Sequence, residues 1–149
     1  YKFFKNGNYN NIKEAFRNSI LKLSKNNQII LVYPVPEVGW HLPRKLNSNL
    51  MLKSQNEITK YLVKQNYLTT SYEIYKKRNY LSFKLLDSIN NENIYRVYPH
   101  KIFCNSQIKN RCITHDNKNF FYYDYVHLLG KGSSSVVSLI MDKIKSLKF

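Results

Sequence analysis

The sequence predicts an α/β domain with three layers, in which helices cover both faces of a largely parallel sheet. Segments with helical apolar spacing alternate along the chain with short runs that are apolar throughout. Runs of the second kind are typical of strands buried on both faces, as in a parallel sheet. The order is helix, strand, loop, helix, strand, loop and helix, and 149 residues are enough for one such domain with a hydrophobic core.

The first helix and strand are expected between residues 11 and 33. Within residues 11–25, apolar side chains recur at helical spacing at Ile12, Phe16, Ile20 and Leu23. Two asparagines end this pattern, and the run QIILVY at residues 28–33 then predicts a buried strand. The next stretch, PVPEVGWHLP, holds three prolines and one glycine, so we expect a long loop at the carboxyl end of the strand.

The middle of the chain is less regular and leads into a second helix. Residues 47–70 predict no more than a short helix, which we place in an insertion over the sheet. Residues 70–89 predict the second helix, with Thr70 or Ser71 as its N-cap and Glu73 in its first turn. Its apolar face is expected to consist of Ile74, Leu81, Leu85 and Ile89.

The last third of the chain completes the alternation. IYRVYP at residues 94–99 predicts another strand, and NFFYYD at residues 119–124 predicts a short extended piece. A C-terminal helix is expected from the spacing of Val136, Ile140, Ile144 and Leu147. Because the alternation begins with a helix, we expect that earlier strands are missing and that residues 1–149 are the C-terminal part of a single domain.

Composition restricts the class of partner. The net charge is +15, from 24 Lys and Arg against 9 Asp and Glu, which would suit an anionic partner such as nucleic acid. The lysines are nevertheless spread over the whole chain, and the longest basic run is residues 76–78. We therefore expect no nucleic-acid partner, and a non-catalytic basic module that binds anionic polymer remains an alternative function. No apolar run approaches the roughly 20 residues of a membrane-spanning helix.

The two cysteines, Cys104 and Cys112, have seven residues between them. A zinc site would need four ligands and closer spacing, so we expect neither a metal nor another cofactor. Two free thiols in a reducing compartment would fit this pattern. A disulfide that closes a polar loop in an oxidising compartment fits it better, and the residues by themselves leave both interpretations open.

The stretch FFYYDYVHLLGKGSSSVV places Asp124 three residues before His127. A histidine oriented by a carboxylate is the usual general base for a serine nucleophile. Spacing alone is equally compatible with an Asp124 that caps a turn beside a partly buried His127. The serines at positions 133–135 lack the Gly-x-Ser-x-Gly pattern of a nucleophile, and we interpret them as the start of the last helix.

A second candidate region is the loop after the first strand. In open α/β sheets, reactive groups lie on loops at the carboxyl ends of strands. This loop carries Glu37, Trp40 and His41, which we regard as possible substrate-binding residues.

Four segments of the chain together resemble one known family. In chain order they are IILVYPVPEVGW, TTSYEIYKKR, VYPHKIFCNSQIKNRC and FFYYDYVHLLGKGSSSVV. Their joint order resembles the C-terminal half of the SGNH hydrolase-like domain attached to membrane-bound sugar O-acyltransferases of acyltransferase family three. The resemblance covers roughly residues 12–145. It implies a three-layer α/β/α (flavodoxin-like) fold, Asp124 as triad acid, His127 as triad base, and a disulfide between Cys104 and Cys112.

The resemblance is incomplete at two points. The nucleophilic serine of the family, in a Gly-Asp-Ser motif, has no match in the chain, so we expect it upstream of residue 1 and expect these 149 residues alone to be inactive. Leu129 stands where the family usually has Ser or Thr, and we expect Gly130 or Ser133 to replace that helix cap.

The function implied by the resemblance is the transfer of an acyl group, in particular acetyl, to a hydroxyl of an envelope polysaccharide through a serine ester. The implied partners are an acyl donor, the polysaccharide acceptor, and the membrane, reached through a preceding transmembrane domain. The implied location is the periplasmic face of the bacterial inner membrane. A free-standing SGNH esterase that hydrolyses carbohydrate or lipid esters is the main alternative, ahead of the basic binding module.

Overall fold

The computed structural model describes residues 9–42, 44–45, 54–64 and 68–147. Its helices and strands are α1 (Tyr9–Leu23), β1 (Ile29–Val32), α3 (Gln55–Lys64), β2 (Thr69–Ser71), α4 (Tyr72–Asp87), β3 (Ile94–Val97), α5 (His100–Phe103), β4 (Arg111–Ile113) and α6 (Gly130–Ser146). The expected long helices correspond to α1, α4 and α6, and the two expected strands correspond to β1 and β3. The predicted alternation is therefore confirmed.

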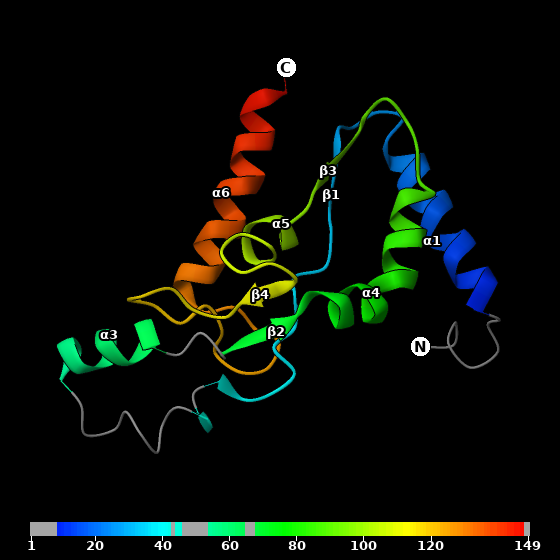
Figure 1. Cartoon of the computed structure of the whole chain (residues 1–149). Coiled ribbons are helices and arrows are strands. Elements are labelled where there is room, and N and C mark those ends of the chain that lie inside the picture. Colours follow the sequence, from blue (N-terminus) through cyan, green and yellow to red (C-terminus); the bar gives the residue numbers. More distant parts are fainter. Residues whose placement is uncertain (1–8, 43, 46–53, 65–67, 148–149) are drawn as a thin grey trace.

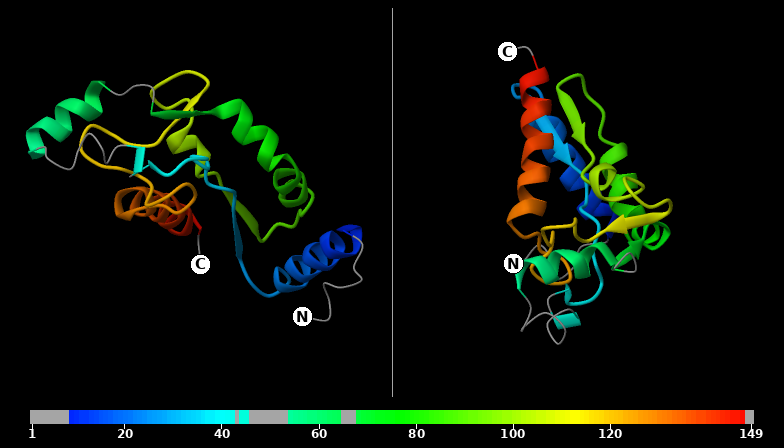
Figure 2. Two further views of the ribbon diagram at one scale, coloured as in Figure 1. Left: turned by 90° about the horizontal axis from the view of Figure 1, so that it is seen from below. Right: turned by 60° about the vertical axis from the view of Figure 1, so that its left-hand side comes forward.

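The central sheet element is a parallel pair formed by β1 and β3. Ile29 lies opposite Ile94 and Val32 opposite Val97. Helices α1 and α4 pack on one face of this pair, and α6 lies against β3 on the other (Figure 1, Figure 2). The connection from β1 to β3 contains α4, as parallel strands require a crossover. The three-layer α/β/α prediction is confirmed.

One cluster of buried side chains, which we call the sheet core, joins helices α1 and α4 to the β1–β3 pair. It consists of Leu31, Tyr33, Ile89 and Ile94, with Ile20 of α1 and Phe83 of α4 packed against it. The polar groups that enter it are paired: the Tyr33 hydroxyl donates to Asp87 Oδ1 at 2.5 Å, and Arg96 Nη2 donates to the Ile89 carbonyl at 2.6 Å. Buried polar groups that keep such partners avoid a desolvation penalty.

The buried face of α4 differs from the expected one. Ser71 is the N-cap, since its Oγ accepts the backbone N–H of Ile74 at 3.3 Å. Ile74 and Leu81, however, are 52% and 50% exposed, so their assignment to the core is wrong. The inward positions hold aromatic rings instead, because Tyr75 and Phe83 pack around His100, with ring centroids 5.7 and 5.5 Å from the imidazole.

The expected face of α1 is only partly buried. Ile20 packs against the sheet core, but Ile12, Phe16 and Leu23 are exposed. The helical spacing therefore predicted the helix correctly and overestimated how much of its apolar stripe is covered.

An antiparallel pair of short strands, β2 and β4, was not expected. Thr70 of β2 lies opposite Cys112 of β4. Arg111 fastens the pair, donating from Nε to Thr69 Oγ1 at 2.8 Å and from Nη2 to the Thr69 carbonyl at 2.5 Å. Strands of three residues are too short for an apolar alternation to reveal them in the sequence.

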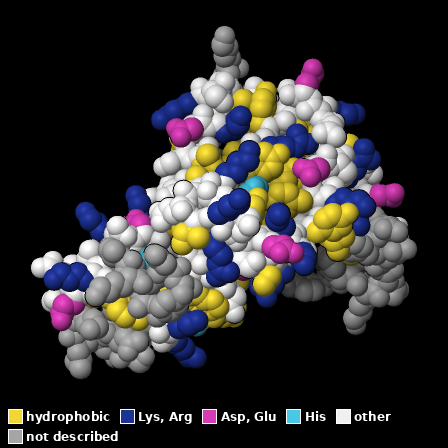
Figure 3. Space-filling view, viewed as in Figure 1, with side chains coloured by type: hydrophobic (Ala, Val, Ile, Leu, Met, Phe, Trp, Pro, Cys, Tyr) yellow, Lys and Arg dark blue, Asp and Glu magenta, His cyan; other side chains and the backbone are white. Residues whose placement is uncertain are grey.

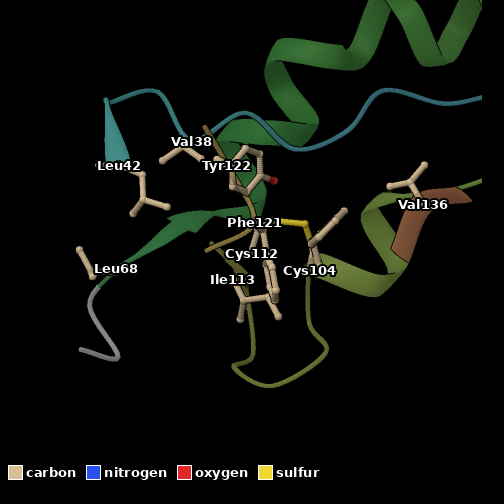
Figure 4. Close-up of a cluster of buried hydrophobic side chains, with 10 residues drawn as sticks. Val38, Leu42, Leu68, Cys104, Cys112, Ile113, Phe121, Tyr122 and Val136 are labelled. Atoms are coloured by element: carbon tan, nitrogen blue, oxygen red, sulfur yellow. A yellow bond between two sulfur atoms is a disulfide. The ribbon is translucent and has the colours of Figure 1, made fainter. Parts of the chain in front are cut away.

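A second buried cluster, which we call the loop core, lies where the loops meet (Figure 4). It consists of Val38, Leu42, Leu68, Phe103, Cys104, Cys112, Ile113, Phe121, Tyr122 and Val136. Cys104 and Cys112 form a disulfide at its centre, which confirms the expected bridge between α5 and β4. Most of these side chains come from loops and strand ends rather than from long helices.

The short helix expected within residues 47–70 is present as α3, but its expected place is wrong. It lies away from the β1–β3 pair, beyond β2 (Figure 1). Tyr61 of α3 packs against the loop core rather than over the sheet. Residues 47–53 and 65–67 of this stretch lie outside the described residues.

The C-terminal helix is confirmed with a shifted start. Val136 is buried, and Ile140 and Ile144 are half-buried along α6. The helix begins at Gly130, so the serines at 133–135 lie in its second turn rather than at its start. Residues 119–124 form only isolated bridges, between Phe120 and His115 and between Tyr122 and Leu128, instead of a strand.

Candidate functional site

Asp124 organises a tight turn at the amino end of α6. Its Oδ1 accepts the backbone N–H groups of Val126 at 2.8 Å and His127 at 2.7 Å. A carboxylate that accepts several N–H bonds is stabilised in its ionised form. The N–H of His127, the N–H of Val126 and the His127 imidazole together lower the pKa of the Asp124 carboxyl to about 2. Asp124 is therefore ionised at neutral pH.

The second carboxylate oxygen of Asp124 orients His127. Its Oδ2 lies 2.7 Å from His127 Nδ1. An ionised carboxylate can only accept a hydrogen bond, so Nδ1 carries the proton and Nε2 of the neutral ring keeps its lone pair. The His127 side chain is 76% exposed, whereas that of Asp124 is 18% exposed. The geometry thus presents a basic nitrogen to the outside, backed by a largely covered acid.

The turn is held at both ends by backbone hydrogen bonds. Tyr123 N donates to the His127 carbonyl and Leu129 N donates to the Phe121 carbonyl, both at 2.8 Å. Gly132 of α6 packs directly against the start of this turn, where a Cβ atom would collide with the Phe121 carbonyl oxygen. The close approach of α6 to residue 121 explains why glycine is needed here.

The proline-rich loop at residues 34–42 lies against this turn. The buried Tyr122 hydroxyl donates to the Pro36 carbonyl at 2.7 Å, and Val38 N donates to the Tyr125 carbonyl at 2.9 Å. The Tyr75 hydroxyl of α4 supports the same loop through the Pro34 carbonyl at 2.6 Å. The two candidate loops predicted from the sequence are therefore neighbours.

The three side chains proposed for substrate binding make separate contacts. Glu37 Oε2 lies 3.5 Å from Arg78 Nη1 of α4. Trp40 lies under Lys45, whose Nζ is 4.5 Å from the ring centroid. His41 Nδ1 accepts the backbone N–H of Arg44 at 3.2 Å. Of these three, Glu37 and Trp40 line a pocket, and His41 does not.

That pocket, which we call the Arg78 pocket, has a volume of about 300 Å³. It is lined by residues 37–40, residues 69–71, Ile74, Tyr75, Arg78 and Arg111. His127 does not line it, but Val38 and Gly39 in its wall donate to the Tyr125 carbonyl, two residues before His127. One wall of the pocket is thus hydrogen-bonded to the turn that carries the Asp124–His127 pair.

Arg78, Arg111 and Tyr122 are site residues that the sequence reasoning missed. Ser71 and Arg78 are seven residues apart, so two helical turns bring them to one side of α4, and this spacing could have indicated Arg78. No local pattern indicates Tyr122 or Arg111, because their partners lie 86 and 42 residues away.

The serines after the turn have structural roles. Ser133 Oγ donates to the Leu128 carbonyl at 3.4 Å and Ser135 Oγ donates to the Lys131 carbonyl at 3.0 Å. The N-cap position of α6 is Leu129, and no side chain caps it. The expectation that Ser133 replaces the missing cap is wrong, because its hydroxyl donates to a carbonyl instead of accepting a hydrogen bond from a backbone N–H group.

Two further features are absent from the described residues. That part of the chain has no group of three or more His, Cys, Asp and Glu side chains that could hold a metal ion. Each helix in that part of the chain is too short or too polar to span a bilayer. On the face seen in Figure 3, Lys and Arg side chains are dispersed rather than gathered in one patch.

Comparison with protein families gives one match. A family model described as "SGNH domain (fused to AT3 domains)" matches residues 2–142. Neither the curated proteins nor the solved structures that were compared with the chain gave a match.

Proposed function

The chain belongs to the SGNH family described as fused to AT3 (acyltransferase-3) domains, and from this premise we propose that Asp124 and His127 are the acid and base of its catalytic triad. Membership supports an acyltransferase or esterase type of enzyme that is associated with a membrane-bound acyltransferase domain. The more specific proposal is O-acyl transfer, in particular O-acetyl transfer, to an envelope polysaccharide. We place this reaction at the periplasmic face of the membrane.

One observation carries the proposal: the Oδ2–Nδ1 distance of 2.7 Å in a turn whose other carboxylate oxygen is bound by two N–H groups. The two N–H hydrogen bonds to Oδ1 are sufficient to stabilise the turn. The hydrogen bond between Oδ2 and His127 Nδ1 is not needed for the turn, and it orients the imidazole ring. Within the described residues, the His127 Nε2 atom has no hydrogen-bond partner. It is therefore available to a substrate or nucleophile hydroxyl.

In the proposed reaction, the serine hydroxyl attacks the carbonyl carbon of the acyl donor while His127 Nε2 takes the hydroxyl proton. The imidazolium is stabilised by ionised Asp124 and gives this proton to the leaving group of the donor. A sugar hydroxyl then loses its proton to Nε2 and attacks the serine ester. The acyl group leaves on the sugar, and the serine recovers a proton from His127.

We propose that the nucleophilic serine belongs to a segment of the same domain outside these 149 residues. The hydroxyls of Ser133 and Ser135 donate to backbone carbonyls within or next to α6, which argues against them as nucleophiles. The oxyanion-hole donors are assigned to the same segment. On this proposal, the 149-residue chain alone has no esterase turnover.

The test is acyl transfer by the full-length protein that carries this domain, measured as O-acetyl groups on isolated polysaccharide. We expect His127→Ala and Asp124→Asn each to reduce the rate about 10³–10⁴-fold. His115→Gln is a matched control outside the turn and should retain near-normal activity. Unchanged acetylation in His127→Ala would exclude the proposal. Release of free acetate instead of sugar acetylation would favour the esterase alternative.

A further inference from the structure

We propose that the Arg78 pocket is an acceptor subsite that binds an acidic sugar, a saccharide unit that carries a carboxylate. This inference rests on the proposed function, because it gives the acceptor of that reaction a chemical class. The pocket was not expected from the sequence as a unit, since its walls come from the 34–42 loop, β2, α4 and β4.

The pocket has the size and mixed lining of a small-ligand site. Its volume of about 300 Å³ lies at the lower end of the range for such sites, which suits one sugar unit of a longer chain. Trp40 and Ile74 provide apolar surface for the C–H groups of a sugar ring. Thr70 and Ser71 provide hydroxyl groups at the pocket wall for sugar hydroxyls.

Arg78 is the group that selects a carboxylate. Its guanidinium has five N–H donors, and its partner among the described residues is Glu37, at the long distance of 3.5 Å. The Arg78 side chain lines the pocket and is 55% exposed, so its remaining donors are open to a ligand. Arginine recognises a carboxylate through two parallel hydrogen bonds, which makes the contact strong and directional.

Gly39 places the loop backbone next to Arg78. Its φ of +79° favours glycine, and a Cβ atom here would lie 3.4 Å from Arg78 Nη1. The loop backbone therefore approaches the guanidinium closely, with no side chain from residue 39 between them.

The charges around the pocket favour an anion. Arg111 is the second cation of the lining, and Thr69 holds it in place. Glu37 is the one acidic residue in the lining, so the described lining carries two positive charges and one negative charge. The chain as a whole has a net charge of +15, which attracts acidic polymers over a longer range.

The pocket is also placed to serve the proposed reaction. Val38 and Gly39 line it and donate to the Tyr125 carbonyl within the Asp124–His127 turn. A polysaccharide held at the Arg78 pocket would thus contact the loop that is hydrogen-bonded to the turn carrying His127.

The experiment is isothermal titration calorimetry of the protein with trigalacturonate, which has one carboxylate per sugar, and with maltotriose, which has none. At an ionic strength of about 0.15 M, where long-range attraction is screened, trigalacturonate should bind and maltotriose should bind at least tenfold more weakly. Arg78→Gln should weaken trigalacturonate binding about tenfold. Glu37→Gln removes the competing carboxylate and should strengthen this binding several-fold.

Lys77→Gln is the matched control, because it removes one exposed positive charge from the same helix outside the pocket. Equal losses in Arg78→Gln and Lys77→Gln, or equal binding of the two trisaccharides, would overturn the inference. His127→Ala should bind trigalacturonate with unchanged affinity, because His127 does not line the pocket. The binding experiment therefore tests the acceptor subsite separately from the catalytic proposal, and either of the two can fail while the other stands.

Discussion

The sheet core and the loop core are built in different ways. The sheet core lies between the β1–β3 pair and helices α1 and α4, and its side chains come from these elements or from the one or two residues that follow them. The loop core gathers residues from α5, β4 and the loops at 34–42 and 120–129, around one disulfide. The candidate catalytic turn and the Arg78 pocket both border the loop core. Both candidate sites therefore lie where individual tertiary contacts, rather than long regular elements, hold the chain.

This difference predicts which region is more sensitive to single substitutions. A helix packed on a sheet shares its stabilisation among many similar contacts. A loop core depends on single bonds and single close approaches, each of which one substitution can remove. We expect such substitutions to disturb the site more than the sheet.

The largest effect is expected from removal of the disulfide in Cys104→Ala/Cys112→Ala. The bridge joins residues eight apart and links α5 to β4. Loss of a disulfide typically costs about 2–4 kcal/mol of unfolding free energy. Chemical denaturation should measure this loss. The exchange rate of backbone amide hydrogens should rise more in β4 than in β1 and β3. Equal increases in all three strands would contradict the separation into two cores.

The next effect tests the approach of α6 to the turn. Gly132→Ala forces a Cβ atom against the Phe121 carbonyl oxygen, and such overpacking costs about 1–3 kcal/mol. Gly130→Ala is the control in the same helix, since nothing lies within 4 Å of its Cβ position. It should be neutral or slightly stabilising in thermal unfolding, because alanine favours the helix. Equal destabilisation by the two variants would exclude the close approach.

A smaller effect is expected from Tyr122→Phe, which removes the 2.7 Å bond to the Pro36 carbonyl. Loss of one hydrogen bond costs about 0.5–1.5 kcal/mol. Because this bond couples the 34–42 loop to the turn, acyl transfer by the full-length protein should also fall. Tyr33→Phe in the sheet core should reduce stability with little direct effect on transfer. If both variants reduced transfer equally, the coupling would lack support.

The smallest effect concerns pH and the junction of the two cores at His100. Burial among aromatic rings is the main cause that lowers the pKa of His100 below its usual 6.5. Protonation therefore favours the unfolded chain, so stability is complete above about pH 6.5 and falls as the pH decreases toward the folded-state pKa. One such group contributes at most about 1.4 kcal/mol per pH unit.

Urea denaturation between pH 7.5 and 5 should reveal this pH dependence of the unfolding free energy. His100→Phe should remove the contribution of His100 to it. Other groups titrate over the same range, so the comparison with the variant isolates His100. An identical slope in the variant would show that His100 does not contribute.

Much of the regular architecture could be predicted because it depends on local patterns. The spacing of Val136, Ile140 and Ile144 predicted α6, and the apolar run at residues 28–33 predicted β1. The prediction failed for Ile74 and Leu81 because helical spacing alone cannot decide which apolar face the aromatic neighbours will cover. The strands β2 and β4 could not be predicted, because each is three residues long and pairs with a partner far away in the sequence.

The candidate site likewise combines contacts that are local in the sequence with contacts between distant residues. Asp124 and His127 are three residues apart, so one turn can bring them together, and a local pattern was enough to predict that they pair. The cysteines, eight apart, were similarly within local reach. The Arg78 pocket and its contact with the turn, by contrast, depend on the folded chain. Tyr122 contacts Pro36 across 86 residues and Glu37 contacts Arg78 across 41, and no local pattern encodes contacts of that range.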